Sequence, residues 1–224
     1  MCIRDSHEPP LHQAILNGDD SEAMMLLNID SDVNSKNYCG MTPLHCAARR
    51  CNVGLVDLLL KMGADANAIT YKTRTPGGYS ALALLGENSH KGLRWEDVQK
   101  IAALLVDHMD MDTFAVQIFP SGRTVWHLVT SRGNHQLLRW LLDYFESRYG
   151  RQNLTIQLNM LTTPNEPGKQ GKSVKDDAMS SNAICRDLVE EKGGINVHPR
   201  VMNPGEKICP GHRWHRQTWR ARWE

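Results

Sequence analysis

The sequence predicts an all-α fold, a solenoid of helix-turn-helix units joined by short β-hairpin loops. Three observations support this prediction: a helix-pair motif at Gly40–Asn67, a copy of it upstream, and further copies downstream. Two short antiparallel helices bury too little apolar surface to fold alone. Copies at a regular period therefore indicate that neighbouring pairs stack into one array.

The stretch Gly40–Asn67 contains a helix start, a turn, a second helix and an outward loop. Thr42 is placed to cap the first helix, and Pro43 fits the first helical position, where a missing N–H costs nothing. The turn at Asn52–Gly54 precedes a second helix that is too apolar to be exposed on all sides. Gly63 suits a left-handed cap at its end.

The upstream copy fixes the period. The interval from Pro10-Leu11-His12 to Pro43-Leu44-His45 equals the interval from Asn34 to Asn67. On these motifs the chain resembles the ankyrin-repeat family, whose period is about 33 residues and whose signature is T-P-L-H-x-A. The resemblance implies a protein-binding scaffold, in which hairpin tips and first helices line a concave surface.

The resemblance also implies a structural role for the histidine of each T-P-L-H turn, which is expected to hydrogen-bond the backbone of adjacent turns. His12, His45 and His127 occupy that position. The turn residues expected to be structural are Thr42, Pro43, His45, Thr124 and His127.

We divide the chain into five segments. Residues 1–6 are interpreted as a sequencing-adapter artefact, because MCIRDS can be encoded by a transposase mosaic end, and Met1 is then not the biological start. The fifth-repeat interpretation rests on Val174 and Val189, which have the same spacing as Leu44 and Leu59. The other segments are 7–148 (four repeats, the third with insertions), 149–171 (a linker), 172–197 (a degenerate fifth repeat) and 198–224 (a disordered tail).

Composition narrows the function classes. A net charge of +1 over 224 residues gives no electrostatic case for nucleic-acid binding, and no apolar run approaches the ~20 residues of a membrane span. The six cysteines lack framework spacing, which favours a reduced compartment, cytoplasmic or nuclear. We expect a monomer that binds another protein.

No catalytic constellation is apparent, so we expect no enzyme activity and no cofactor. The stretch Gly168–Ser173 resembles a phosphate-binding loop, but Glu166 stands where such a loop needs its first glycine. Cys209, His212 and His215 lack the spacing of a known zinc finger. Two alternatives remain open: a tail that carries a weak metal or nucleic-acid site, and a targeting arm of a truncated kinase or ubiquitin ligase.

The enlarged hairpin Thr70–Tyr79, flanked by the tip at Lys36–Tyr38, is the candidate binding site. It offers aromatic and cationic side chains, which are common at the energetic centre of protein interfaces. Arg49 and Arg50 are expected to extend the same positive surface. The candidate partner-binding residues are Lys36, Tyr38, Arg49, Arg50, Tyr71, Lys72, Arg74 and Tyr79.

Three side chains are expected to pack in the core. Leu59 and Leu141 should be buried between helices, and Trp126, at the position of Leu44, should be a core anchor. Cys51 stands where other repeats have Gly18 and Gly133. If that position requires a positive φ, a residue with a Cβ is strained there.

Overall fold

The computed structural model describes residues 8–29, 32–71, 77–88, 92–118, 121–160, 174–175 and 183–194. The described residues form helices and loops without a sheet, and Ile118 and Arg123 make an isolated antiparallel bridge. The helices are α1 (Pro10–Asn17), α2 (Asp20–Asn28), α3 (Pro43–Arg50), α4 (Val53–Lys61), α5 (Ala81–Asn88), α6 (Trp95–Asp107), α7 (Met111–Phe114), α8 (Val125–Ser131), α9 (His135–Tyr149), α10 (Arg151–Leu158) and α12 (Ala183–Glu191).

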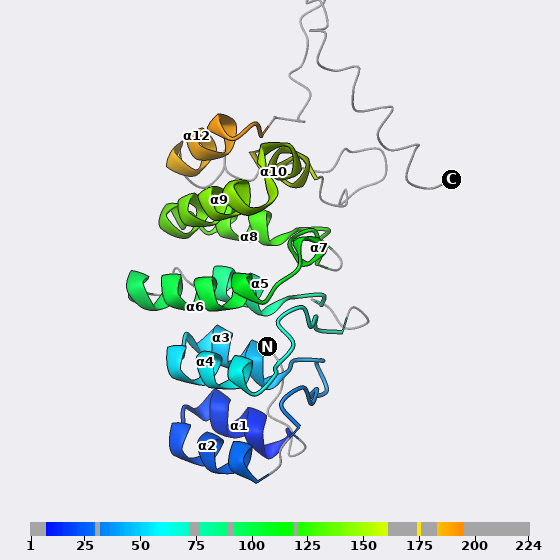
Figure 1. The fold of residues 1–224 in the computed structure, drawn as a ribbon, viewed down its shortest axis with the longest axis vertical. Coiled ribbons are helices and arrows are strands. Elements are labelled where there is room, and N and C mark those ends of the chain that lie inside the picture. Colours follow the sequence, from blue (N-terminus) through cyan, green and yellow to red (C-terminus); the bar gives the residue numbers. More distant parts are fainter. Residues whose placement is uncertain are drawn as a thin grey trace, which may run out of the picture.

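The helices stack as pairs into an elongated all-α solenoid (Figure 1). In one layer α1 packs on α3, α3 on α5, and α5 on α8. In the other layer α4 packs on α6 and α6 on α9. Each repeat therefore contacts its neighbours, and the core runs continuously between the two layers.

The three packing expectations are confirmed. Leu59, Leu141 and Trp126 have no solvent-exposed surface. Ala47 and Ala48 are equally buried on α3, where their small side chains allow α1 and α5 to approach from either side.

In three of the repeats, a left-handed residue follows the first helix. Gly18 follows α1 with φ 84°, and Gly133 follows α8 with φ 71°. Cys51 adopts φ 57° at the same place after α3, so it carries the strain that glycine avoids.

An aromatic cluster includes a helix that the sequence analysis missed. The short helix α7 brings Phe114 within 5.8 Å of the Trp126 ring and 5.1 Å of the Phe145 ring, measured between centroids. Phe145 in turn contacts Tyr149 at 4.7 Å. The loop before α8 is thereby fixed to the core through Phe114.

The linker predicted at 149–171 is wrong over its first part. Residues Arg151–Leu158 form α10, which packs on α9 and buries Leu154 and Leu158 completely. These two leucines lie four positions apart and so on one face of a helix, which offsets the entropy of ordering the segment. The remainder, 161–171, lies outside the described residues.

The far end of the array is closed by α10 and α12. Val174, Cys185 and Val189 are fully buried, and α12 packs on α9. Lys192 donates to Asp143 of α9 at 2.8 Å. The fifth repeat stays a prediction, because much of 172–197 is outside the described residues, as are 1–6 and 198–224.

Candidate functional site

His45 connects two neighbouring loops. Its Nδ1 accepts a hydrogen bond from the Thr42 backbone N–H at 3.1 Å, and Thr42 and His45 form a capping box at the start of α3. Its Nε2 lies 3.0 Å from the Tyr79 carbonyl oxygen in the enlarged hairpin. The ring therefore anchors the base of that hairpin to α3.

These contacts fix the protonation state of His45. A backbone N–H can only donate, so Nδ1 must be the bare nitrogen and Nε2 must carry the proton donated to Tyr79. Burial is the main cause that lowers the pKa of His45 to about 4. The neutral ring is a structural connector rather than a group poised for catalysis.

The same turn recurs in other repeats with variations. His127 accepts from the Thr124 N–H at 3.2 Å, and the Nε2 of His12 lies 2.8 Å from the Met41 carbonyl oxygen. In the third repeat Ala83 stands at the histidine position, and its N–H bonds Ser80 Oγ at 3.2 Å instead. The structural roles implied for these turn residues stay predictions.

Thr70 closes the base of the enlarged hairpin. Its N–H donates to the Tyr79 carbonyl at 3.0 Å, and its hydroxyl oxygen accepts from the N–H groups of Gly78 at 3.0 Å and Tyr79 at 2.9 Å. Thr70 is buried and Tyr79 is half-buried against the core. The hairpin therefore leaves the array from a rigid base.

Tyr71 links this base to the preceding tip. Its N–H donates to the Cys39 carbonyl at 3.1 Å, and its ring packs so closely on Gly40 that a Cβ there would clash. The Lys36 Nζ lies 5.6 Å from the centre of the Tyr71 ring, a cation–π contact. Tyr71 remains 43% exposed, so an aromatic ring and a cation face solvent together.

The tip itself is held by Asn37. The Asn37 side-chain oxygen accepts from the N–H groups of Cys39 and Met41, and its amide nitrogen donates to Glu8 at 2.6 Å. Tyr38, next in the chain, is half-buried. Two other predicted contact residues, Lys72 and Arg74, lie outside the described residues.

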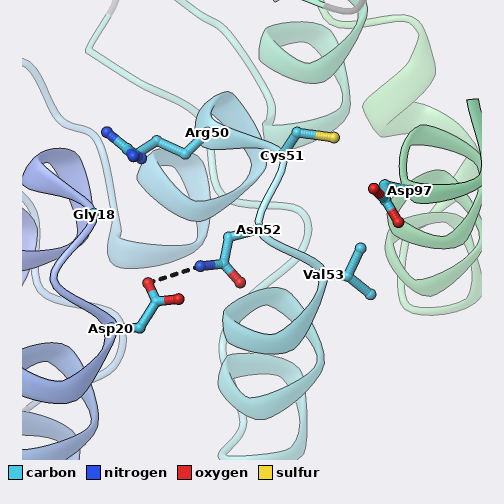
Figure 2. A pocket seen from close by; sticks show the side chains of 7 residues that line it. All are labelled: Gly18, Asp20, Arg50, Cys51, Asn52, Val53 and Asp97. Atoms are coloured by element: carbon cyan, nitrogen blue, oxygen red, sulfur yellow. Dashed lines mark hydrogen bonds between the residues drawn. The ribbon is translucent and has the colours of Figure 1, made fainter. Parts of the chain in front are cut away.

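Arg49 and Arg50 are not brought beside the hairpin. They end α3, about 12 Å of helix away from Thr42 at its start. Arg50 Nη1 donates to the Leu16 carbonyl at 2.6 Å. Figure 2 shows Arg50 extending toward Gly18 across a shallow polar pocket. The expected continuous positive surface is therefore interrupted by the length of α3.

A chain of asparagine contacts, which sequence reasoning did not assign, also runs between repeats. The Asn34 side chain accepts from the Asp65 N–H at 2.8 Å. Asn67, one period later, accepts from the Asp110 N–H at 2.8 Å and from the Thr113 hydroxyl at 2.6 Å. The two asparagines occupy the same position within their repeats, and this spacing was the sequence signal that could have predicted their shared role. These bonds fix successive loops at one spacing on the same side of the array.

Among the described residues, no cluster of histidine, cysteine and acidic side chains could hold a metal ion. None of the helices in that part of the chain is long and apolar enough to cross a membrane. The tail residues considered for metal, Cys209, His212 and His215, are outside this range.

Comparison with known proteins identifies the repeats. Residues 11–60 match the family model described as ankyrin repeats (many copies). FPV219 of fowlpox virus (strain NVSL), named as an ankyrin repeat protein, is 39% identical over 59 residues, 26% of this chain and 14% of that protein. The human ankyrin repeat and SOCS box protein 3 is 37% identical over 70 residues, 30% of this chain and 14% of that protein.

A longer match comes from rice. XBOS33 of Oryza sativa subsp. japonica, named as an E3 ubiquitin-protein ligase, is 31% identical over 137 residues. The match covers 60% of this chain and 24% of that protein, so each relative is much longer than its matched region. The T-P-L-H turns, the stacked helix pairs and these matches lead to one conclusion: the chain contains ankyrin repeats.

Proposed function

We propose that this chain is a non-catalytic scaffold that binds a partner protein through its hairpin side. Ankyrin repeats are generally protein–protein interaction modules. The observation that carries the proposal is the exposed Tyr71 ring with Lys36 above it, held by the backbone bond to Cys39. An aromatic ring that is already ordered costs little entropy to immobilise on binding.

We call Lys36, Tyr38, Tyr71 and Tyr79 the hairpin patch, and the proposed site extends from it to Lys72 and Arg74 in the same loop. Rigid bonds at Thr70 and Asn37 hold the base, while the loop beyond is free to vary in sequence and length. A partner that also contacts Arg49 and Arg50 must extend along α3. We propose that no cofactor or bound metal takes part.

The test compares two double variants of the full chain. Lys36→Ala with Tyr71→Ala removes the cation and the aromatic ring from the hairpin patch. The matched control, Lys61→Ala with Met62→Ala, removes an exposed cation and a side chain that is 39% exposed at the end of α4. Proteins retained from a lysate by each immobilised chain are quantified by mass spectrometry, and thermal midpoints are measured alongside.

We expect the hairpin variant to lose at least one retained protein by tenfold or more, while the control retains it. Both variants should melt at similar temperatures, because each removes one exposed lysine and one side chain of similar exposure, 43% for Tyr71 and 39% for Met62. Equal retention by all three chains would contradict the proposed site.

A second candidate function is supported by the match to XBOS33. There the matched region occupies 24% of a protein named as a ubiquitin ligase. In this version the repeats bind a substrate and deliver it to a catalytic domain elsewhere in the same polypeptide. Sequencing the intact transcript distinguishes the two candidate functions. Delivery of a substrate requires that the transcript encode a catalytic domain, whereas a non-catalytic scaffold has none.

A further inference from the structure

The helix α2 lies at one end of the array (Figure 1). On α2, Met24 is 46% exposed and Met25 66%, and Ile29, the C-cap of the helix, is 74% exposed. Exposed apolar residues are ordinary when scattered, but these three lie within six consecutive positions. A terminal repeat that faces water normally carries a polar outer face.

The next repeat covers one counterpart of these residues and exposes the other. Leu58, one period after Met25, is half-buried against the core, and Met62, one period after Ile29, is 39% exposed. At the opposite end of the array, α10 and α12 cover α9, where Leu142 and Phe145 are fully buried. The array is therefore closed at its C-terminal end, while α2 keeps the composition of a packed helix without a described neighbour over Met25 and Ile29.

The stretch of chain that contains α2 is acidic in sequence, although Arg50 of α3 lies beside it at Gly18. From Glu8 to Ser35 the sequence contains six aspartate and glutamate residues and no lysine or arginine. Glu22 and Met25 follow the spacing i and i+3, which places them on one face of α2, and Ile29 follows directly after the helix as its C-cap. All three are exposed. We call Glu22, Met24, Met25 and Ile29 the α2 outer face.

We propose that the α2 outer face binds a basic, apolar segment of another protein. Large apolar side chains of such a segment would cover Met25 and Ile29, and its lysines or arginines would lie beside Glu22 and the neighbouring Asp19. Methionine side chains are unbranched and adapt to the shape of their partner. This surface lies in the layer that continues with α4, α6 and α9 (Figure 1), and it shares no residue with the hairpin patch.

Charge decides between this occupant and a second copy of the chain. Two α2 outer faces docked on a two-fold axis would bring two acidic stretches together, and neither stretch carries a lysine or arginine between Glu8 and Ser35. Like charges in contact oppose association, whereas a basic segment is attracted to them. The chain contains a segment of suitable composition in its own tail, Lys207–Arg222, which the experiment must separate from a partner.

The probe is a synthetic amphipathic peptide that has lysine and leucine at helical spacing. Its fluorescence anisotropy reports binding to the full chain, and carbon-13-labelled methionine methyl groups report the position by NMR. The α2 variant is Met25→Ser with Ile29→Ser. The matched control is Ile156→Ser with Ile184→Ser, whose side chains are 61% and 48% exposed on α10 and α12.

We expect the peptide to shift the methyl signals of Met24 and Met25, and its Kd to weaken at least tenfold with the α2 variant but not with the control. A peptide with glutamate in place of lysine should not bind. Equal binding to the α2 variant would overturn the proposal. Methyl shifts that depend on the concentration of the chain alone would also overturn it, because they indicate binding of a second copy. Methyl shifts that appear on deletion of residues 207–224 would do the same, because they indicate that the chain's own tail occupies the surface.

Discussion

The histidines at the T-P-L-H position differ in the hydrogen-bond donor that their Nδ1 atoms receive. Thr42 and Thr124 each donate a backbone N–H to the ring of the following histidine. In the first repeat Pro9 stands at the threonine position, and proline has no N–H to donate. The Nδ1 of His12 is accordingly buried without a hydrogen-bond partner among the described residues. One residue type thus explains an unsatisfied polar atom.

Replacing Pro9 with threonine should restore the missing donor. We expect Pro9→Thr to raise the free energy of unfolding by about 1 kcal/mol, because satisfying a buried acceptor outweighs the lost rigidity of proline. The measurement is urea unfolding of both chains. Pro9→Ala, which restores the N–H alone, should recover part of the gain, and a lower stability of both variants would refute the explanation.

His45 makes the fold sensitive to acid. Its pKa is about 4 in the folded chain, below the ordinary 6.5, so the unfolded chain binds more protons between these values. The free energy of unfolding therefore falls as the pH decreases from 6.5 toward 4, by an amount on the order of 3 kcal/mol. His45→Gln should be less stable at pH 7, and the gap should narrow toward pH 4. A gap that is constant with pH would show that His45 does not titrate in this way.

At the scale of elements, α10 is the sharpest departure from the sequence-based prediction. Leu154→Ala should lower the free energy of unfolding by about 2–5 kcal/mol, because it empties a fully buried site between α10 and α9. Ile156→Ala, on the same helix but 61% exposed, should change it by less than about 0.5 kcal/mol. Urea unfolding that is equally unaffected by both substitutions would restore the linker interpretation.

The sequence was informative where a repeat pattern was intact. T-P-L-H turns and leucines at matching offsets were enough to predict the burial of Leu59, Leu141 and Trp126. The repeat pattern did not predict α7 and α10, because neither belongs to the repeat and each is stabilised by side chains outside its own segment. Phe114 needs Trp126, and Leu154 needs α9, so their segments read as loop in isolation.

The candidate site was less accessible to sequence reasoning than the fold. Composition singled out Tyr71 and Lys36, yet their contact depends on a backbone bond between Tyr71 and Cys39, which belong to the loops of different repeats. Arg49 and Arg50 matched in charge, but the helix direction carried them away from the hairpin. The charge and type of a residue can be read from the sequence, whereas the side of the molecule on which it lies depends on how the repeats stack.

On the scale of the whole molecule, stability is a sum over neighbouring repeats. Each helix pair packs on the next, so a weakened interface is felt locally. Cys51, strained in the left-handed region, and Ala83, without a histidine, mark the least regular joints in the described array. These departures lie in the turns and first helices, while the outer layer of α4, α6 and α9 remains continuous.

The central claim is that a partner protein contacts the hairpin side of this array. Site-specific photocrosslinking tests it most directly, with a photoreactive phenylalanine analogue placed at Tyr71 in one chain and at Ile156 in another. Both positions are exposed, and Ile156 lies on α10 at the closed end. The account predicts a covalent adduct with a discrete partner from position 71 and none from position 156. An adduct from position 156 without one from position 71 would contradict it.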